Sequence, residues 1–198
     1  MPGNNPAQRI VDLLEKVPRV GQQEPMVKGL KALFAYEPAD AYRGHAQRLE
    51  QVLVQIDLAE RGLVALQFPS SLFARQFTQA RNAFTPSALN SNFSHVTGHV
   101  TIDVVLAFRW AAFALPDEGE QLKPESLDAL ITEVTALLEE PALQGLPQVL
   151  RDKLIEHLTA MLIALRGCPV TGSEPLQKAV KDLGLDLATN KESFDTAI

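Results

Sequence analysis

Apolar residues recur at helical spacing along most of this chain, and that spacing limits what the chain can fold into. The clearest case lies within residues 39–66, where apolar side chains follow one another three or four positions apart. This is the period of one face of an α-helix, whereas a half-buried strand alternates every second residue. The stripe consists of Leu49, Val52, Leu53, Ile56, Ala59, Leu63 and Leu66.

Proline, glycine and capping residues divide the rest of the chain into further helices. Asn5 is followed by proline, which is typical of a helix start, because asparagine caps the first turn and proline there loses no hydrogen bond. In the tail, the pattern predicts a helix over residues 148–166 and a turn over residues 167–172. A last helix is expected between Ser173 and Gly184. The sequence therefore predicts an all-α, bundle-like fold of seven to nine helices.

One acidic segment near the middle of the chain is the best place for an internal break. Residues 116–121 combine proline and glycine with three carboxylates. We expect an N-terminal helical part over residues 1–115 and a C-terminal helical part over residues 122–188. The 198 residues suffice to bury a core without disulfides, and we expect the two parts to pack as one unit.

Charge and composition exclude several classes of protein. Hydrophobic residues make up 46% of the chain, which is too many for a disordered protein. The net charge is −6, whereas a generic nucleic-acid binder carries a basic excess that neutralises phosphates. The single cysteine, Cys168, cannot form an internal disulfide or a thiolate metal cluster, and we expect it to be a buried apolar residue.

The apolar segments also bear on location. The longest apolar run covers residues 104–115, contains Arg109, and is shorter than the ~20 residues that cross a bilayer. The start of the chain lacks the basic and apolar regions of a secretory signal. We therefore expect a cytoplasmic protein without membrane insertion. Trp110, the only tryptophan, lies in this run and is expected in the core.

The stretch SHVTGHVTID, residues 94–103, allows three structural interpretations. It alternates between polar and β-branched apolar residues, as a half-buried strand does, and a homodimer would supply the missing partner strand. It can also form a helix. The third interpretation is a loop through Gly98, followed by a helix that begins near His99 or Val100, with the histidines at its solvated entry.

The helical interpretation suggests an alternative function. His95, His99 and Asp103 are spaced i, i+4 and i+8, so a continuous helix would place them on one face, where they would bind a metal ion. A metal-dependent enzyme of unrecognised type is therefore an alternative. The zinc hydrolase motif is absent, because Val96 occupies the place of its glutamate.

A second alternative is a binder of single-stranded nucleic acid. Phe73, Phe77 and Phe84 interleave with Arg75 and Arg81, as in a platform on which bases stack. The phenylalanines also have core spacing, so we expect most of them to be buried and nucleic acid not to be the partner. The chain has no Walker loop, GxGxxG or GxSxG motif, which argues against an enzyme and against a nucleotide cofactor.

The tail over residues 122–187 resembles a pattern of uncharacterised bacterial all-helical proteins. In that pattern a leucine-rich helix precedes a lysine-containing helix, a turn ending in glycine and a closing helix. The matching residues are Lys153, Leu154, Leu158, Leu165, Gly172, Leu176 and Val180. Cys168-Pro169 departs from the aromatic turn of the pattern. The resemblance implies an association with mobile elements or phage defence, and it brings no catalytic residue.

These observations favour a non-enzymatic helical module for protein interaction or regulation, with phage defence or a mobile element as its setting. Amphipathic helices, an acidic net charge and the absence of a catalytic motif support this interpretation. A protein partner or self-association is the expected mode of action, and no cofactor is expected.

Overall fold

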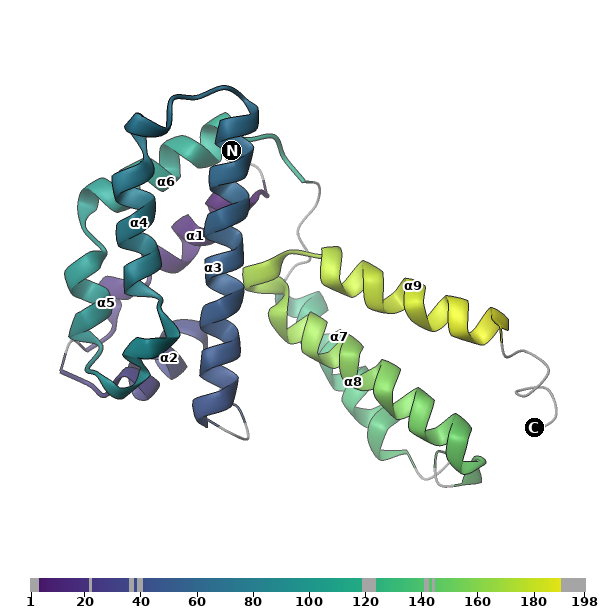
Figure 1. Ribbon diagram of the computed structural model, residues 1–198. Coiled ribbons are helices and arrows are strands. Elements are labelled where there is room, and N and C mark those ends of the chain that lie inside the picture. The colour runs from purple at the N-terminus through teal and green to yellow at the C-terminus, as the bar shows by residue number, and fades with distance from the viewer. Residues whose placement is uncertain are drawn as a thin grey trace. The chain divides into compact units, whose positions relative to one another are not determined.

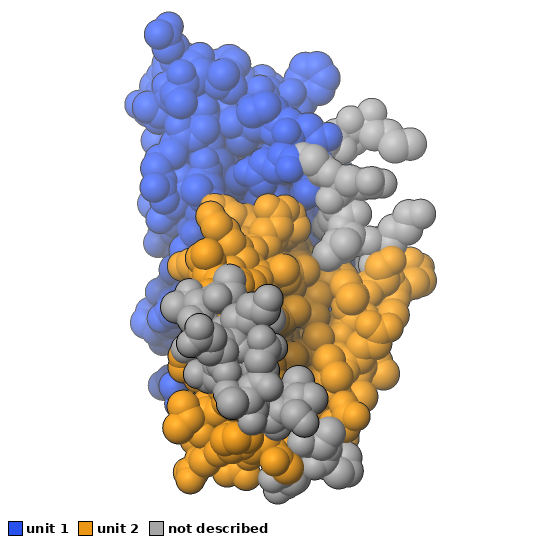
Figure 2. Space-filling view, turned by 90° about the vertical axis from the view of Figure 1, so that its right-hand side faces the viewer, with its two compact units in different colours: residues 1–120 blue, residues 121–198 orange. Residues whose placement is uncertain are grey.

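The computed structural model describes residues 4–21, 23–35, 38, 41–118, 124–140, 143 and 145–189. These residues form nine α-helices, three short 3-10 helices and no strand, which confirms the predicted all-α fold (Figure 1). The chain divides into two compact units, residues 1–120 (unit 1) and residues 121–198 (unit 2), which Figure 2 colours separately. Their boundary lies within the acidic segment 116–121. The packing of both parts as one unit stays a prediction.

Unit 1 is built around its longest helix, α3. Helix α1 packs against both α3 and α6, and α4 packs against α3, α5 and α6 (Figure 1). The elements of unit 1 are α1 (Pro6–Leu14), η1 (Val17–Arg19), α2 (Met26–Phe34), α3 (Ala41–Ala65), η2 (Ser70–Leu72), α4 (Ala74–Ala83), η3 (Pro86–Asn90), α5 (Ser94–His99) and α6 (Ile102–Ala114).

Phenylalanine side chains fill the core of unit 1. Phe73, Phe77 and Phe84 are completely buried, as their helical spacing predicted. Phe77 of α4 stacks on Phe108 of α6 with ring centroids 4.2 Å apart, and Phe73 meets Phe77 edge-on at 5.3 Å. Such aromatic pairs contribute about 0.5–1.5 kcal/mol beyond the area that they bury. They fix α4 against α6.

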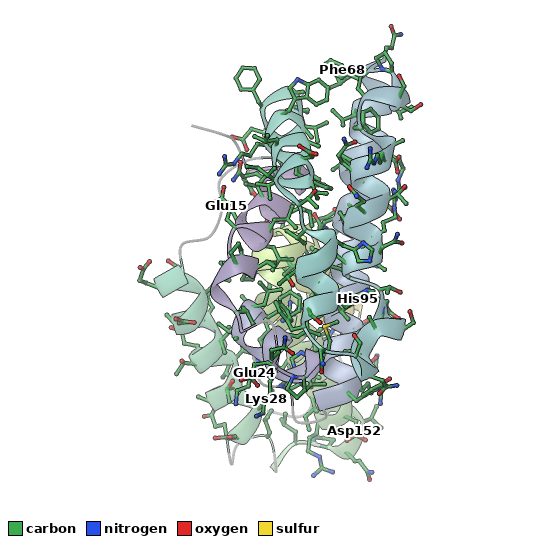
Figure 3. The ribbon with its side chains drawn as sticks, turned by 90° about the vertical axis from the view of Figure 1, so that its left-hand side faces the viewer. Glu15, Glu24, Lys28, Phe68, His95 and Asp152 are labelled. Carbon is green, nitrogen blue, oxygen red and sulfur yellow. The ribbon has the colours of Figure 1, made fainter. Side chains whose placement is uncertain are left out.

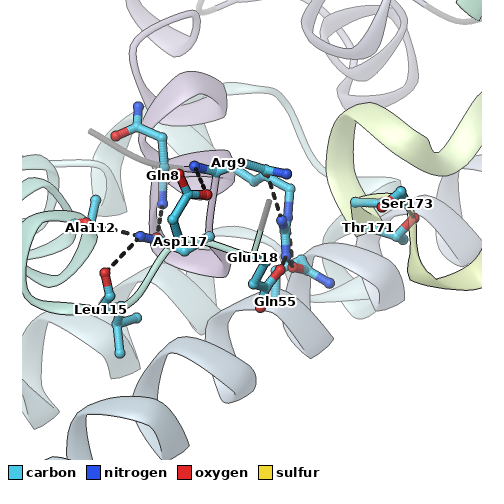
Figure 4. Close-up of polar contacts among 12 residues, drawn as sticks. Gln8, Arg9, Gln55, Ala112, Leu115, Asp117, Glu118, Thr171 and Ser173 are labelled. Carbon is cyan, nitrogen blue, oxygen red and sulfur yellow. Dashed lines mark hydrogen bonds and ion pairs between the residues drawn. The ribbon is translucent and has the colours of Figure 1, made fainter. Parts of the chain in front are cut away.

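A polar network ties the start of α1 to the end of α6. The side-chain oxygen of Asn5 accepts a hydrogen bond from the Gln8 backbone N–H, which confirms the predicted cap. Its amide nitrogen donates to the carbonyl oxygens of Ala112 and Leu115, at 2.9 and 3.3 Å (Figure 4). Asn5 is completely buried, so one side chain satisfies backbone groups at the ends of two helices.

Arg9 lies buried beside this cap, and its guanidinium donates hydrogen bonds to three different side chains. Its Nε and Nη2 atoms donate to Oε1 of Gln55 at 3.0 and 2.7 Å, and Nη2 also donates to Oε2 of Glu118 at 2.9 Å (Figure 4). Its Nη1 atom donates to Oδ1 of Asn4. A buried charge is tolerated when it is paired and hydrogen-bonded, so this network is structural.

Residues 94–103 form the whole of α5, a break and the first two residues of α6, so the strand interpretation is wrong. The break lies at Val100 and Thr101, between α5 and α6, and Gly98 lies inside α5. The loop through Gly98 was therefore also a wrong expectation. Val96 and Val104, eight residues apart, are completely buried. Their spacing fits both an alternating and a helical pattern, and the core of unit 1 selects the helices.

Unit 2 consists of α7 (Pro124–Glu139), α8 (Gln148–Thr171) and α9 (Glu174–Thr189), with α8 packed against both others. Its core side chains are Leu127, Val134, Leu158, Leu165 and Cys168. The burial of Cys168 is as predicted. Two sequence predictions are wrong here, because α8 continues through Pro169 and α9 continues through Gly184. Pro169 is the third residue from the end of α8, and its missing N–H removes one hydrogen bond from the last turn.

Among the described helices, α8 is long and apolar enough to cross a membrane by length and composition alone. A third of its most apolar window is buried within the protein. One such helix is weak evidence for a membrane span, because the core helix of a three-helix unit passes the same test. The predicted absence of membrane insertion stays a prediction.

Candidate functional site

Helix α6 is apolar on nearly all sides, yet only one side of it is buried. Among its thirteen residues, Asp103 and Arg109 are the only charged ones. The buried side consists of Val104, Phe108, Ala111 and Ala112. A helix that is hydrophobic all round is normally covered all round. The remaining apolar side of α6 therefore requires an explanation.

Four large side chains form this uncovered side, which we call the α6 stripe. Ile102, Leu106, Trp110 and Phe113 are 74%, 50%, 39% and 87% exposed. Their spacing of four, four and three residues places them along one side of the helix, over about 16 Å. Single exposed apolar residues are ordinary on a protein surface, whereas a contiguous row of large ones is less common.

A cleft runs beside the stripe, between α6 and the start of α4. It encloses about 440 Å³ and belongs entirely to unit 1. This volume lies in the range of ordinary ligand pockets. Leu72 of η2 is 60% exposed and extends the apolar surface across the cleft. The lining residues of this cleft, which we call the α6 cleft, are Leu72, Phe73, Gln76, Asp103, Leu106, Ala107 and Trp110.

Aromatic contacts hold the walls of the α6 cleft in place. The stack of Phe77 on Phe108 joins α4 to α6, and Phe73 lies fully buried in the wall. Phe68, labelled in Figure 3, meets the Trp110 ring edge-on with centroids 4.8 Å apart. Trp110 is therefore held by a neighbouring ring while part of it faces solvent. The prediction that Trp110 lies in the core is wrong.

The polar groups of the α6 cleft are few. Among the described residues that line it, Gln76 and Asp103 are the only polar ones, and Asp103 is exposed. Asp103 lies in the first turn of α6, where the helix dipole favours a carboxylate. Arg109, the other charge on α6, is paired with Glu15 of α1 at 2.7 Å. The described lining of the cleft is thus apolar except for one amide and one carboxylate.

The structure brings two of the three predicted metal ligands together. The rings of His95 and His99 meet edge-on with centroids 4.9 Å apart, and His95 Nε2 lies 2.8 Å from the Asn82 carbonyl oxygen. Asp103 lies on the next helix and lines the α6 cleft. Within the described part of the chain, no three His, Cys, Asp or Glu side chains are grouped to hold a metal ion. The break at residues 100–101 removes the continuous helix that this hypothesis assumed, and metal binding stays a prediction.

The features behind the nucleic-acid alternative have structural roles. Phe73, Phe77 and Phe84 are buried and offer no face to a base. Arg81 forms ion pairs with Asp57, at 2.9 Å, and with Glu60, and these raise the pKa of its guanidinium despite partial burial. Stacking requires exposed rings, so these residues do not form a platform.

Unit 2 contains two other groups with shifted pKa values, the Cys168 thiol and the Asp186 carboxylate. Burial raises the pKa of the Cys168 thiol, which keeps it protonated and weakly nucleophilic. His157 of α8 lies 2.9 Å from Oδ2 of Asp186 on α9, and Lys153 lies 3.8 Å from the same oxygen. The His157 contact is the main cause that lowers the pKa of Asp186, with Lys153 adding to it. This group joins two helices at the surface of unit 2.

The fold and the cleft define a class: an all-α protein with an exposed row of apolar side chains beside a cleft. Comparison with family models, curated proteins and solved structures gave no match to this chain. The geometry of α6 is therefore the best guide to function. Sequence analysis identified the apolar run over residues 104–115 but not the exposed side, because a helix that is apolar all round gives no signal of its orientation.

Proposed function

We propose that this chain is a non-enzymatic protein-interaction module that binds a helix of a partner protein along the α6 stripe and in the α6 cleft. The observation that carries the proposal is the exposure of four large apolar side chains on one side of α6. Covering them removes apolar surface from water, at about 25 cal/mol per Å² of area buried.

The geometry of the stripe suits a helix as the occupant. Ile102, Leu106 and Trp110 form one i±4n ridge, which packs into the groove between ridges of a second helix. A length of about 16 Å corresponds to three helical turns, which is long enough for the i, i+3, i+4 and i+7 anchors of a helix bound in a groove, since these span about 10 Å. Leu72, on the other wall, gives the occupant a second apolar contact.

The chemistry of the cleft favours binding over catalysis. Asp103 is the only ionisable side chain among the lining residues that the structure describes. General acid–base and nucleophilic mechanisms need a second group within hydrogen-bond reach, and the described lining contains no nucleophile–base pair. The predicted setting in phage defence or a mobile element, and the cytoplasmic location, stay predictions of the sequence.

A matched pair of variants tests the proposal. Leu106 and Val54 are each 50% exposed, but Leu106 lies in the α6 stripe and Val54 lies on α3, away from it. Helical peptides without tryptophan, selected by display on the purified full chain, serve as probes. Since Trp110 is the only tryptophan, its fluorescence reports binding at the cleft.

We expect selected peptides to shift the Trp110 emission, to lose at least ten-fold in affinity for Leu106→Asp and to bind Val54→Asp normally. Circular dichroism confirms that both variants keep their helices. Peptides that bind both variants equally well, or a selection that yields no binder sensitive to Leu106→Asp, would show that the stripe is not a helix-binding surface.

A further inference from the structure

We infer that the helix bound at the α6 cleft is basic and places a lysine or arginine against Asp103. This inference rests on the proposed function and adds the chemistry of the partner. The observation behind it is one exposed carboxylate in a cleft whose other described lining residues are apolar except Gln76 and include no cation.

When a bound helix covers the cleft, the group that faces Asp103 must compensate for the water that the carboxylate loses. A carboxylate beside a bound apolar helix loses water, and burying a charge without a partner is costly. The first turn of α6 offsets part of this cost. A lysine or arginine on the occupant supplies the rest, because its aliphatic stem lies along apolar surface while its head reaches the carboxylate.

The neighbours of Asp103 favour the same class of partner. Trp110 presents part of its ring in the same cleft, and an aromatic face attracts a cation. Gln76, also in the lining, offers an amide oxygen as a second acceptor. Arg109, the cation of α6 itself, is already paired with Glu15. The cleft thus presents two groups that attract a cation and one that accepts its hydrogen bond.

Charge also argues for another protein, and against a second copy of this chain, as the occupant of the cleft. Unit 2 has 12 acidic and seven basic residues, so it carries −5 of the net charge of −6. A second copy docked stripe against stripe would cover each Asp103 with apolar side chains. A basic amphipathic helix of another protein satisfies both the stripe and the carboxylate.

The display selection tests this inference directly. Library positions flanking the apolar anchors are randomised, and binders that also recognise Leu106→Asp are removed. We expect lysine and arginine to be enriched at the position facing Asp103, and aspartate and glutamate to be depleted. Binders that depend on Leu106 but show no basic excess would overturn the inference while leaving helix binding intact.

A double-mutant cycle then assigns the contact. One selected peptide and its Lys→Gln form are titrated against the wild-type chain, Asp103→Asn and Asp103→Glu, with Asp128→Asn on α7 as a control of equal charge change. We expect Asp103→Asn to weaken the lysine peptide about two- to five-fold, the range of an exposed ion pair. Asp103→Glu should retain the affinity, Asp128→Asn should have no effect, and 0.5 M salt should reduce the difference.

The Gln peptide should bind the wild-type chain and Asp103→Asn equally well. Equal binding of the lysine peptide to wild type and Asp103→Asn would refute the assigned contact. An absence of any binder that needs Leu106 would instead refute the proposed function. The two failures are therefore distinguishable.

Discussion

At the scale of single residues, close packing decides which small side chains are required. Gly29 lies in α2 against Phe93, and a Cβ atom at Gly29 would overlap the Phe93 ring. Gly98 lies in α5, and a Cβ atom there would meet nothing within 4 Å. Both are helical glycines in the same unit, so they form a matched pair that separates packing from helix propensity.

We expect Gly29→Ala to destabilise the protein by about 1–3 kcal/mol, the usual cost of overpacking a core. Gly98→Ala should stabilise it by up to about 1 kcal/mol, because alanine fits a helix better than glycine. Urea unfolding followed by Trp110 fluorescence measures both changes. Equal effects of the two substitutions would contradict the close approach of Phe93 to α2.

His45 is a single residue that we expect to make the free energy of unfolding depend on pH. Its side chain is buried on α3, and its Nδ1 atom has no hydrogen-bond partner among the described residues. Burial lowers the pKa of His45, and Arg48 lowers it further. The folded protein therefore holds His45 neutral, whereas the unfolded chain binds a proton near pH ~6.5.

The resulting stability is present above the pKa of the unfolded state and is lost as the pH falls below it. We expect the free energy of unfolding to decrease between pH 7 and pH 5, and to decrease less in His45→Leu. Urea titrations at four pH values, followed by Trp110 fluorescence, measure both slopes. Identical slopes in the two proteins would show that His45 does not contribute.

At the scale of the elements, the sequence identifies helices better than it identifies their ends. The cap at Asn5 and the burial of Phe77 follow from local pattern, because each depends on residues within one or two turns. The predicted ends of α8 at residue 166 and of α9 at Gly184 are wrong. Proline and glycine lower helix propensity, but tertiary packing can outweigh this cost. Leu165 and Cys168, buried in unit 2, favour the continuation of α8.

The sequence pattern does not predict which side of α6 faces the core. Amphipathic helices reveal their buried side through a polar one, but α6 has few polar residues. The side that faces the core is set by its contacts with α1 and α4, which are distant in sequence. The exposure of Trp110 and the cleft beside it therefore required the three-dimensional structure.

At the scale of the whole molecule, the two units differ in how deeply they bury their cores. Unit 1 contains many completely buried side chains, Ile10, Leu30, Ile56 and Phe77 among them. In unit 2 the best-buried core side chain that the structure describes, Leu165, keeps 2% of its surface exposed. Unit 2 is also the smaller, and small units bury a lower fraction of their surface. Unit 2 is therefore expected to be the less stable.

Each unit carries a unique probe, which makes this difference measurable. Trp110 is the only tryptophan and belongs to unit 1, whereas Cys168 is the only cysteine and belongs to the core of unit 2. We expect Cys168 to become reactive toward a thiol reagent at a lower urea concentration than the one that changes Trp110 fluorescence. Burial and a raised thiol pKa keep Cys168 unreactive while unit 2 is folded, so its labelling reports opening.

A Cys168→Ser variant controls for background labelling, and it should leave the Trp110 transition unchanged if the units unfold separately. Coincident transitions for both probes would contradict separate unfolding, because two-state behaviour of the whole chain requires the units to be coupled. That outcome would instead support the prediction that the two helical parts pack as one unit.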